Sequence, residues 1–401
     1  PKTLPSTVSM LTSLYPAWSG VETNRGVLSD EALTLAEVLH DAGFATAAWT
    51  TNGNLVRANG VAQGFDRFAF LPPPADAASL TDHALAEWSP EGADTGSRRF
   101  TWLHYIDPHG PYTPPGPDAD RFVRDPYYDG SIGVRLRLDE HRRINWNQGL
   151  GGVPHYQRLP FLEDPRRRQR DFYVARYDAE IRYFDGELQR LLATLQERGR
   201  LADTVVVLTA DHGEGMGEHG LYFEHGWFVY QDQVHVPWLI RLPGKPSARR
   251  VTTPVELVDL APTLLEILGI EVPGSFQGRG LRPVLEGGDA PRRPIYSITP
   301  DSYPQRYAGV RLGPWKLIRT VDKAHHRRVS EHLFQLEEDP SEVQDRLAGE
   351  PEVAAGLRRI LDAGPWNRPE GATVPGGERE TLDPDSLDPE VRDSLRSLGY
   401  L

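Results

Sequence analysis

Residues 209–214 place a carboxylate beside an imidazole at the end of a β-branched run. Asp211 and His212 follow the stretch 204–209 after Ala210, and Gly213 lets the backbone turn sharply there. Oxygen and nitrogen ligands of this kind suit a divalent cation such as Mn²⁺, Zn²⁺ or Ca²⁺. A surface turn in which Asp211 caps the next helix would use the same residues. The spacing alone leaves both interpretations open.

Thr3 is a candidate nucleophile at the beginning of a predicted helix. A threonine hydroxyl attacks only after a metal ion or a base has taken its proton. The start of a helix also places backbone N–H groups beside a developing anion or a bound phosphate. Taken alone, a hydroxyl residue such as Thr3 or Ser6 is far more often a helix cap. A catalytic role for Thr3 therefore needs support from the rest of the chain.

Four histidines beside glycine or in turns are candidates for acid–base chemistry. They are His109, His212, His219 and His225. A histidine would serve here as the general acid for a departing alkoxide, or as a donor to a non-bridging oxygen. Each of them by itself is more commonly a structural or surface residue. Tyr112 and Tyr222 are expected to pack rather than to react.

The elements that carry these residues alternate between strand and helix, as in an α/β fold. The predicted strands are 44–50, 100–105, 204–209 and 236–242. The predicted helices are 33–43, 171–196 and 256–268. The composition of 204–209 is typical of a central parallel strand. Since open α/β sheets bind ligands outside the carboxyl ends of their strands, polar groups from distant segments can converge there.

We divide the chain into a catalytic domain, 1–290, and a small C-terminal subdomain with a tail, 291–401. Residues 110–170 are rich in Pro, Gly, Tyr and Arg, and we expect a long excursion over the site. After residue 290, short strands separated by turns predict a small antiparallel sheet that contributes little chemistry. Residues 363–385 are expected to be a loose linker, and 389–401 a short docking helix.

Composition excludes several classes of function. The formal net charge is -13, which argues against a nucleic-acid binder because phosphate backbones need a positive footprint. The chain contains no cysteine, so disulfides and thiolate chemistry within it are excluded. No stretch approaches the roughly 20 apolar residues of a membrane-spanning helix.

Taken together, these segments resemble the sulfatase family of the alkaline phosphatase superfamily. TLPSTVSMLTSLYP is similar to the family's nucleophile signature, HYIDPHGPYTPP to its substrate loop, and VVVLTADHGEGMGEHG to its metal strand. YAGVRLGPWKLI, HLFQLEEDPSEVQDRL and SLGYL resemble its C-terminal sheet and tail. The resemblance implies an alkaline-phosphatase-like three-layer α/β fold. Its central sheet would be mostly parallel, with a small C-terminal antiparallel subdomain.

The resemblance also implies a role for each candidate residue. Asp211 and His212 would hold one divalent metal ion, Mn²⁺, Zn²⁺ or Ca²⁺, at the Thr3 hydroxyl, which would attack in line. His109 and His225 would stabilise equatorial oxygens or protonate the leaving group. The substrate would be a small-molecule, glycan or lipid ester and not a nucleic acid. The family implies an extracytoplasmic or membrane-anchored location.

Two positions of the nucleophile motif depart from the family pattern. Sulfatases begin it with a cysteine or serine that is oxidised to formylglycine, and Thr3 cannot give that aldehyde. Thr7 stands where the motif has an arginine. Superfamily members with threonine are phosphodiesterases, phosphonate hydrolases, or phosphoglycerol and phosphoethanolamine transferases. The resemblance therefore implies a metal-dependent hydrolase or transferase of phosphate, phosphonate or sulfate esters.

The family's first strand carries acidic metal ligands shortly before the nucleophile. The 401 residues begin at Pro1, so we expect this strand to be missing and the 401-residue piece by itself to be inactive or nearly so. Two alternatives remain open at this point. One is a sulfuric ester hydrolase proper, and the other is a non-catalytic remnant of the fold.

Overall fold

The computed structural model of this chain describes most of its 401 residues. The described residues are 1–88, 98–116, 119, 121–124, 153–161, 163–164, 166, 169–244, 248–288, 292–300, 303–322, 328–367, 381–398 and 400. Most of the predicted excursion 110–170 and part of the predicted linker 363–385 lie outside these ranges. Among the helices that the structure describes, none has the length and apolarity needed to cross a bilayer.

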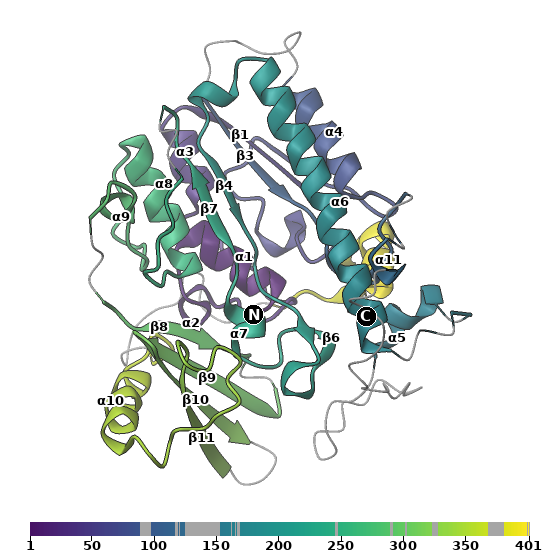
Figure 1. Cartoon of the computed structure of the whole chain (residues 1–401). Helices are drawn as coiled ribbons and strands as arrows, with labels where there is room; N and C mark the ends of the chain where they lie inside the picture. The colour runs from purple at the N-terminus through teal and green to yellow at the C-terminus, as the bar shows by residue number, and fades with distance from the viewer. Residues whose placement is uncertain are drawn as a thin grey trace.

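Three layers form the larger part of the structure, with strands between two sets of helices (Figure 1). One outer layer contains α1 (Thr3–Thr12), α3 (Leu35–Asp41) and α8 (Leu260–Leu268). The other contains α4 (Ala77–Glu87) and α6 (Arg170–Glu197). The predicted helices 33–43, 171–196 and 256–268 are therefore present, the last as α8 preceded by a short 3-10 turn, η8 (Leu257–Asp259).

The strands between these layers form a parallel and an antiparallel part. β1 (Phe44–Thr50) pairs in parallel with β2 (Arg67–Phe70) on one edge and with β3 (Arg98–His104) on the other. β4 (Val206–Thr209) instead pairs antiparallel with β7 (Trp238–Arg241). The strand predicted at 204–209 is therefore present, but the prediction that it is parallel to its neighbour is wrong for the pairing that the structure describes. An apolar β-branched run indicates burial but not the direction of the neighbouring strand.

The two parts of the sheet share one core. Phe100 of β3 and Val207 of β4 pack on the same cluster, which contains Leu35, Leu39 and Leu265 from the outer helices. Complete burial of a leucine side chain contributes roughly 1.5–3 kcal/mol to folding. This shared core holds the carboxyl ends of β3 and β4 near each other without hydrogen bonds between them in the part of the chain that is described.

Local signals explain where α3 begins and ends. Thr34 and Glu37 form a capping box, in which the Glu37 N–H donates to Thr34 Oγ1 and the Thr34 N–H donates to Glu37 Oε2. Gly43 has a φ of +82°, which stops the helix and turns the chain into β1. These contacts set the position of β1, whose carboxyl end faces the candidate site.

A four-stranded antiparallel sheet follows residue 290, as predicted. Its order is β11–β10–β9–β8, with β8 (Ile295–Ile298), β9 (Gln305–Leu312), β10 (Trp315–Asp322) and β11 (Arg328–Gln335). Helix α10 (Pro351–Asp362) covers this sheet with Leu357 and Leu361. The tail then returns to the three-layer part as α11 (Pro389–Ser397), which packs Val391 and Leu395 against Val56.

Candidate active site

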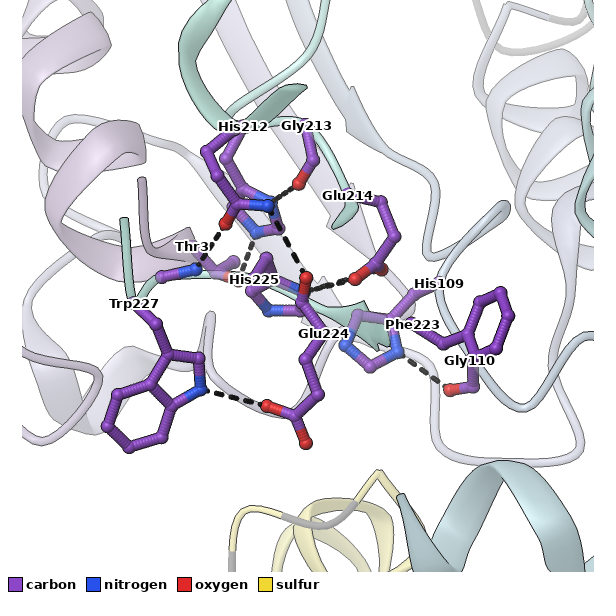
Figure 2. A network of polar contacts seen from close by, with 12 residues as sticks. Thr3, His109, Gly110, His212, Gly213, Glu214, Phe223, Glu224, His225 and Trp227 are labelled. Carbon is purple, nitrogen blue, oxygen red and sulfur yellow. Dashed lines mark hydrogen bonds and ion pairs between the residues drawn. The ribbon is translucent and has the colours of Figure 1, made fainter. Parts of the chain in front are cut away.

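The residues predicted to act together do converge in space. Thr3, His109, His212 and His225 lie in one network of side chains (Figure 2). Thr3 is the first residue of α1, His212 follows β4, and His109 follows β3. The network forms at the carboxyl ends of these strands, where an α/β sheet is expected to hold its ligands.

Thr3 is buried with its hydroxyl turned toward His212. Its side chain is 1% exposed, and Oγ1 lies 3.4 Å from His212 Nε2. The N-cap position is Lys2, so Thr3 is the first residue inside α1 and not its cap. The Leu4 N–H donates to Asn24 Oδ1, which anchors the first turn of the helix. The positive end of the helix dipole favours negative charge at this hydroxyl.

The proton on the His212 ring is placed by a backbone carbonyl. His212 Nδ1 lies 2.8 Å from the Gly213 oxygen, and because a carbonyl only accepts, Nδ1 carries the hydrogen. Burial lowers the pKa of His212 and keeps the ring neutral. The lone pair of Nε2 therefore faces Thr3 Oγ1. A histidine that donates its other N–H to a carbonyl is the usual form of a metal-ligating imidazole.

Asp211 supplies a charged carboxylate beside this lone pair. Burial alone would raise the pKa of Asp211, but the imidazoles of His212 and His104 outweigh burial and lower it. Oδ2 lies 3.4 Å from His212 Nε2 and 3.9 Å from His104 Nε2. His104 was not singled out from the sequence. The available signal was its position as the first residue of HYIDPH, at the end of a predicted strand.

The donors of Asp211 and His212 fit two ligands of a divalent cation, an oxygen and a neutral imidazole nitrogen. Protein metal sites use four or more ligands. Among the residues that the structure describes, no group of three or more histidine, aspartate or glutamate side chains could hold a metal ion. The described residues by themselves therefore do not make up a complete metal site.

His225 faces a second carboxyl group across a short hairpin. β5 (Gly215–Met216) pairs with β6 (Tyr222–Glu224), which brings Glu214 opposite His225. His225 Nδ1 lies 3.3 Å from Glu214 Oε1. Burial raises the pKa of Glu214 well above its ordinary value and lowers the pKa of His225 well below its own. Burial therefore opposes charge on both members of the pair. The sequence analysis did not assign a role to Glu214.

The His225 ring contacts the rings of both other histidines of the network. The His212 and His225 rings are stacked with centroids 4.0 Å apart, and the His225 and His109 centroids are 5.2 Å apart. Burial lowers the pKa of His109 to about 4. His219 does not take part in these ring contacts, since it stacks on Tyr230 at 3.6 Å. His219 therefore has the structural role that was the alternative to acid–base chemistry for each of the four histidines.

The two tyrosines that were expected to pack do so. Tyr112 is 0% exposed and lies in a core cluster with Tyr173 and Phe223, and Tyr222 packs against the same cluster. The residues after 290 were expected to add little chemistry to the site. Tyr400 is an exception, because its side chain reaches the network of histidines. The hydroxyl of Tyr400 contacts both His109 and His225.

A pair of buried carboxyl groups anchors the loop that carries His109. Glu180 of α6 hydrogen-bonds to the side chain of Asp107, and burial raises the pKa of Asp107 to about 6. Burial, followed by the charge of Asp107, raises the pKa of Glu180 from its ordinary value of 4.5 to about 9. At neutral pH the folded protein therefore holds a proton on Glu180 that the unfolded chain has lost.

Glu180→Gln should reduce the loss of stability that accompanies rising pH. The contribution of Glu180 is fully present below pH 4.5 and is lost as the pH rises toward about 9. Within this window the free energy of unfolding falls by up to about 1.4 kcal/mol per pH unit. Glutamine keeps a donor for Asp107 and cannot titrate. Urea unfolding of both proteins from pH 5 to 9 tests this, and parallel stability curves would contradict it.

Comparison with known proteins supports the predicted fold and family. A family model described as Sulfatase matches residues 1–270, and one described as N-sulphoglucosamine sulphohydrolase, C-terminal, matches residues 217–361. Arylsulfatase K of Danio rerio is 33% identical over 214 residues, 50% of this chain and 38% of that protein. Choline-sulfatase of Rhizobium meliloti is 27% identical over 307 residues, 76% of this chain and 56% of that protein. The matched part thus spans less than two thirds of either relative.

Two solved structures show the same fold. The phosphonate monoester hydrolase from Silicibacter pomeroyi has a TM-score of 0.68 and 23% identity, covering 90% of this chain and 84% of that one. A protein in complex with its substrate D-glucosamine-2-N,6-O-disulfate has a TM-score of 0.67 and 21% identity, covering 90% of this chain and 87% of that one. The alkaline-phosphatase-like α/β fold predicted from the sequence is confirmed.

Proposed function

Because the chain belongs to the sulfatase family, we propose that the protein cleaves phosphate or phosphonate esters by in-line attack of Thr3. The observation that carries this proposal is the buried Thr3 hydroxyl, 3.4 Å from the unprotonated Nε2 of His212. A hydroxyl at the start of a helix, beside a carboxylate–imidazole pair, is placed for activation by a cation held on that pair. Since the matched part covers less than two thirds of the relatives, the activity of the whole protein is part of the proposal.

Asp211 and His212 would hold the divalent cation, with further acidic ligands from outside the described residues, as the family resemblance implies. Such a cation lowers the pKa of a bound hydroxyl and polarises the ester. The Thr3 oxygen then forms a bond to phosphorus as the bond to the leaving alkoxide breaks. The alkoxide takes up the proton that the Thr3 hydroxyl has lost. Water or an acceptor alcohol then attacks phosphorus, which breaks the bond to Thr3, and the proton of this second nucleophile returns to the Thr3 oxygen.

His225 and His109 would serve the oxygens of the substrate. Both rings are neutral in the folded protein because burial lowers the pKa of each. A neutral imidazole offers one N–H donor and one lone pair. One ring can therefore donate to a non-bridging oxygen or the leaving group, while another accepts a proton from the second nucleophile.

Thr3 also determines which ester class the site favours. A formylglycine hydrate expels sulfate by breaking its own carbon–oxygen bond. A threonine ester cannot do this and must be cleaved by a second attack at phosphorus or sulfur. A phosphoryl intermediate suits that route, because fixed positive and hydrogen-bonding groups can neutralise its charge in the second in-line step.

Full-length protein should turn over an aryl phosphodiester or an aryl phosphonate monoester faster than the matched aryl sulfate. We expect kcat/KM to differ by tenfold or more, about 1.4 kcal/mol in transition-state stabilisation. The three substrates should share one aryl leaving group, so that only the central atom and its substituents differ. A tenfold preference for the sulfate would contradict the role assigned to threonine.

Sulfate ester hydrolysis is the second candidate function. It is favoured by the printed names of the relatives, which include arylsulfatases and choline-sulfatase. A preference for aryl sulfate that disappears in Thr3→Ala would support this second candidate. Absence of turnover of all three esters by metal-loaded full-length protein would instead support a non-catalytic remnant of the fold.

A further inference from the structure

The C-terminal tail carries one side chain into the candidate active site. The Leu382 N–H donates to the Arg25 oxygen at 2.8 Å, which ties the beginning of the tail to the segment after α1. Helix α11 then packs Val391 and Leu395 against Val56, which lies beyond the carboxyl end of β1. The chain turns back at the end of α11, where the Tyr400 N–H donates to the Leu395 oxygen at 2.8 Å.

The hydroxyl of Tyr400 lies between two catalytic candidates. Its oxygen is 3.0 Å from His109 Nε2 and 3.2 Å from His225 Nε2. The Tyr400 ring also lies against the His109 ring, with centroids 5.8 Å apart. Both histidines therefore share one phenol oxygen, although this residue follows His109 by 291 positions in the chain.

The contacts of His109 with Gly110 and Tyr400 determine where the protons of this network lie. His109 Nδ1 lies 2.7 Å from the Gly110 oxygen and must donate to it, so Nε2 of the neutral ring is an acceptor. The Tyr400 hydroxyl therefore donates to His109 Nε2. Because its only hydrogen is used in that bond, its oxygen accepts from His225 Nε2–H.

We propose that Tyr400 is a positioning residue of the active site, which fixes the tautomers of His109 and His225 through its hydroxyl. His225 is held as the Nε2–H donor and His109 as the Nε2 acceptor. The kinetic consequence rests on the proposed function, whereas the tautomers themselves do not.

A spectroscopic test addresses the tautomers without any substrate. Full-length ¹⁵N-labelled protein loaded with Zn²⁺ should show His109 as the Nδ1–H tautomer and His225 as the Nε2–H tautomer in long-range ¹H–¹⁵N spectra. His109→Gln and His225→Gln assign the two signals. In Tyr400→Phe, both rings should change their ring-nitrogen shifts, because the bridging oxygen is gone.

Tyr183→Phe is a matched control for this substitution. Its hydroxyl donates to Asp76 Oδ2 at 2.7 Å, on the α4–α6 side of the molecule, so the same atom is removed from a part-buried contact elsewhere. The signals of His109 and His225 should not move in this variant. Opposite tautomers in the wild type, or identical His109 and His225 shifts in the wild type and Tyr400→Phe, would overturn the proposal.

The kcat and KM of Tyr400→Phe show whether the Tyr400 hydroxyl positions the histidines or obstructs the site. Tyr400→Phe should lower kcat by about tenfold or more with KM changed by less than about threefold, because the substrate still binds but the proton positions are lost. Thermal unfolding of each variant shows whether the fold is retained. A higher kcat/KM in Tyr400→Phe would mean that the hydroxyl obstructs the site, and the proposal would be wrong.

If no ester is turned over by the wild type, the proposed function fails while the tautomer measurement still decides the role of Tyr400. If the ester is cleaved but the histidine shifts do not respond to Tyr400→Phe, the role proposed for Tyr400 fails while the proposed function stands. The two hypotheses can therefore fail separately.

Discussion

Thr3→Ala should lower kcat/KM for the preferred ester by about 10³-fold or more, equivalent to ~4 kcal/mol in transition-state stabilisation. The substitution removes the oxygen that forms the covalent bond to phosphorus. This oxygen is buried and lies 3.4 Å from His212 Nε2, so a solvent water does not simply take its place in line with the leaving group. Initial-rate kinetics on metal-loaded full-length protein measure the effect.

Two controls show whether the loss reflects chemistry. Thr3→Ser keeps the hydroxyl and should retain activity to within about tenfold, because only a methyl group is removed. Thr12→Ala makes the same change at the other end of α1, where the hydroxyl donates to the Val8 oxygen at 2.7 Å. This variant should lose stability and keep its kcat. Full activity of Thr3→Ala would show that Thr3 is not the nucleophile.

Asp211→Ala should remove about one bound divalent ion per chain and abolish turnover together with it. The carboxylate is charged at neutral pH because the imidazoles of His212 and His104 lower its pKa against the effect of burial. Alanine leaves His212 as the single described donor of the pair, which is too few for a stable site. Elemental analysis of full-length protein after removal of free metal counts the ions.

The matched control is Asp185→Ala, which removes an exposed carboxylate on α6. Its metal content should equal that of the wild type. Equal metal content in Asp211→Ala and the wild type would contradict the assignment of Asp211 as a ligand. Loss of activity with the metal retained would instead point to a role for this carboxylate in orienting His212.

Local structure was largely determined by the sequence itself. The helix α3 with its capping box, the strand β1 and the stop at Gly43 follow from neighbouring residues, since caps and amphipathic periodicity act within a few positions. The Asp-His pair after β4 was recognised in the same way. Its alternative, a surface turn, does not describe the structure, because His212 contacts the buried Thr3.

The tertiary structure determined the strand pairing and the side-chain contacts between residues that are far apart in the chain. The antiparallel pairing of β4 with β7 was not predicted, because a β-branched run carries no information on the direction of its neighbour. His104 reaches Asp211 and Tyr400 reaches His109 only after the layers have packed. The proton positions on His109 and His225 depend on which carbonyl, carboxyl and phenol oxygens surround each ring, and such contacts between distant segments are set by packing of the whole fold.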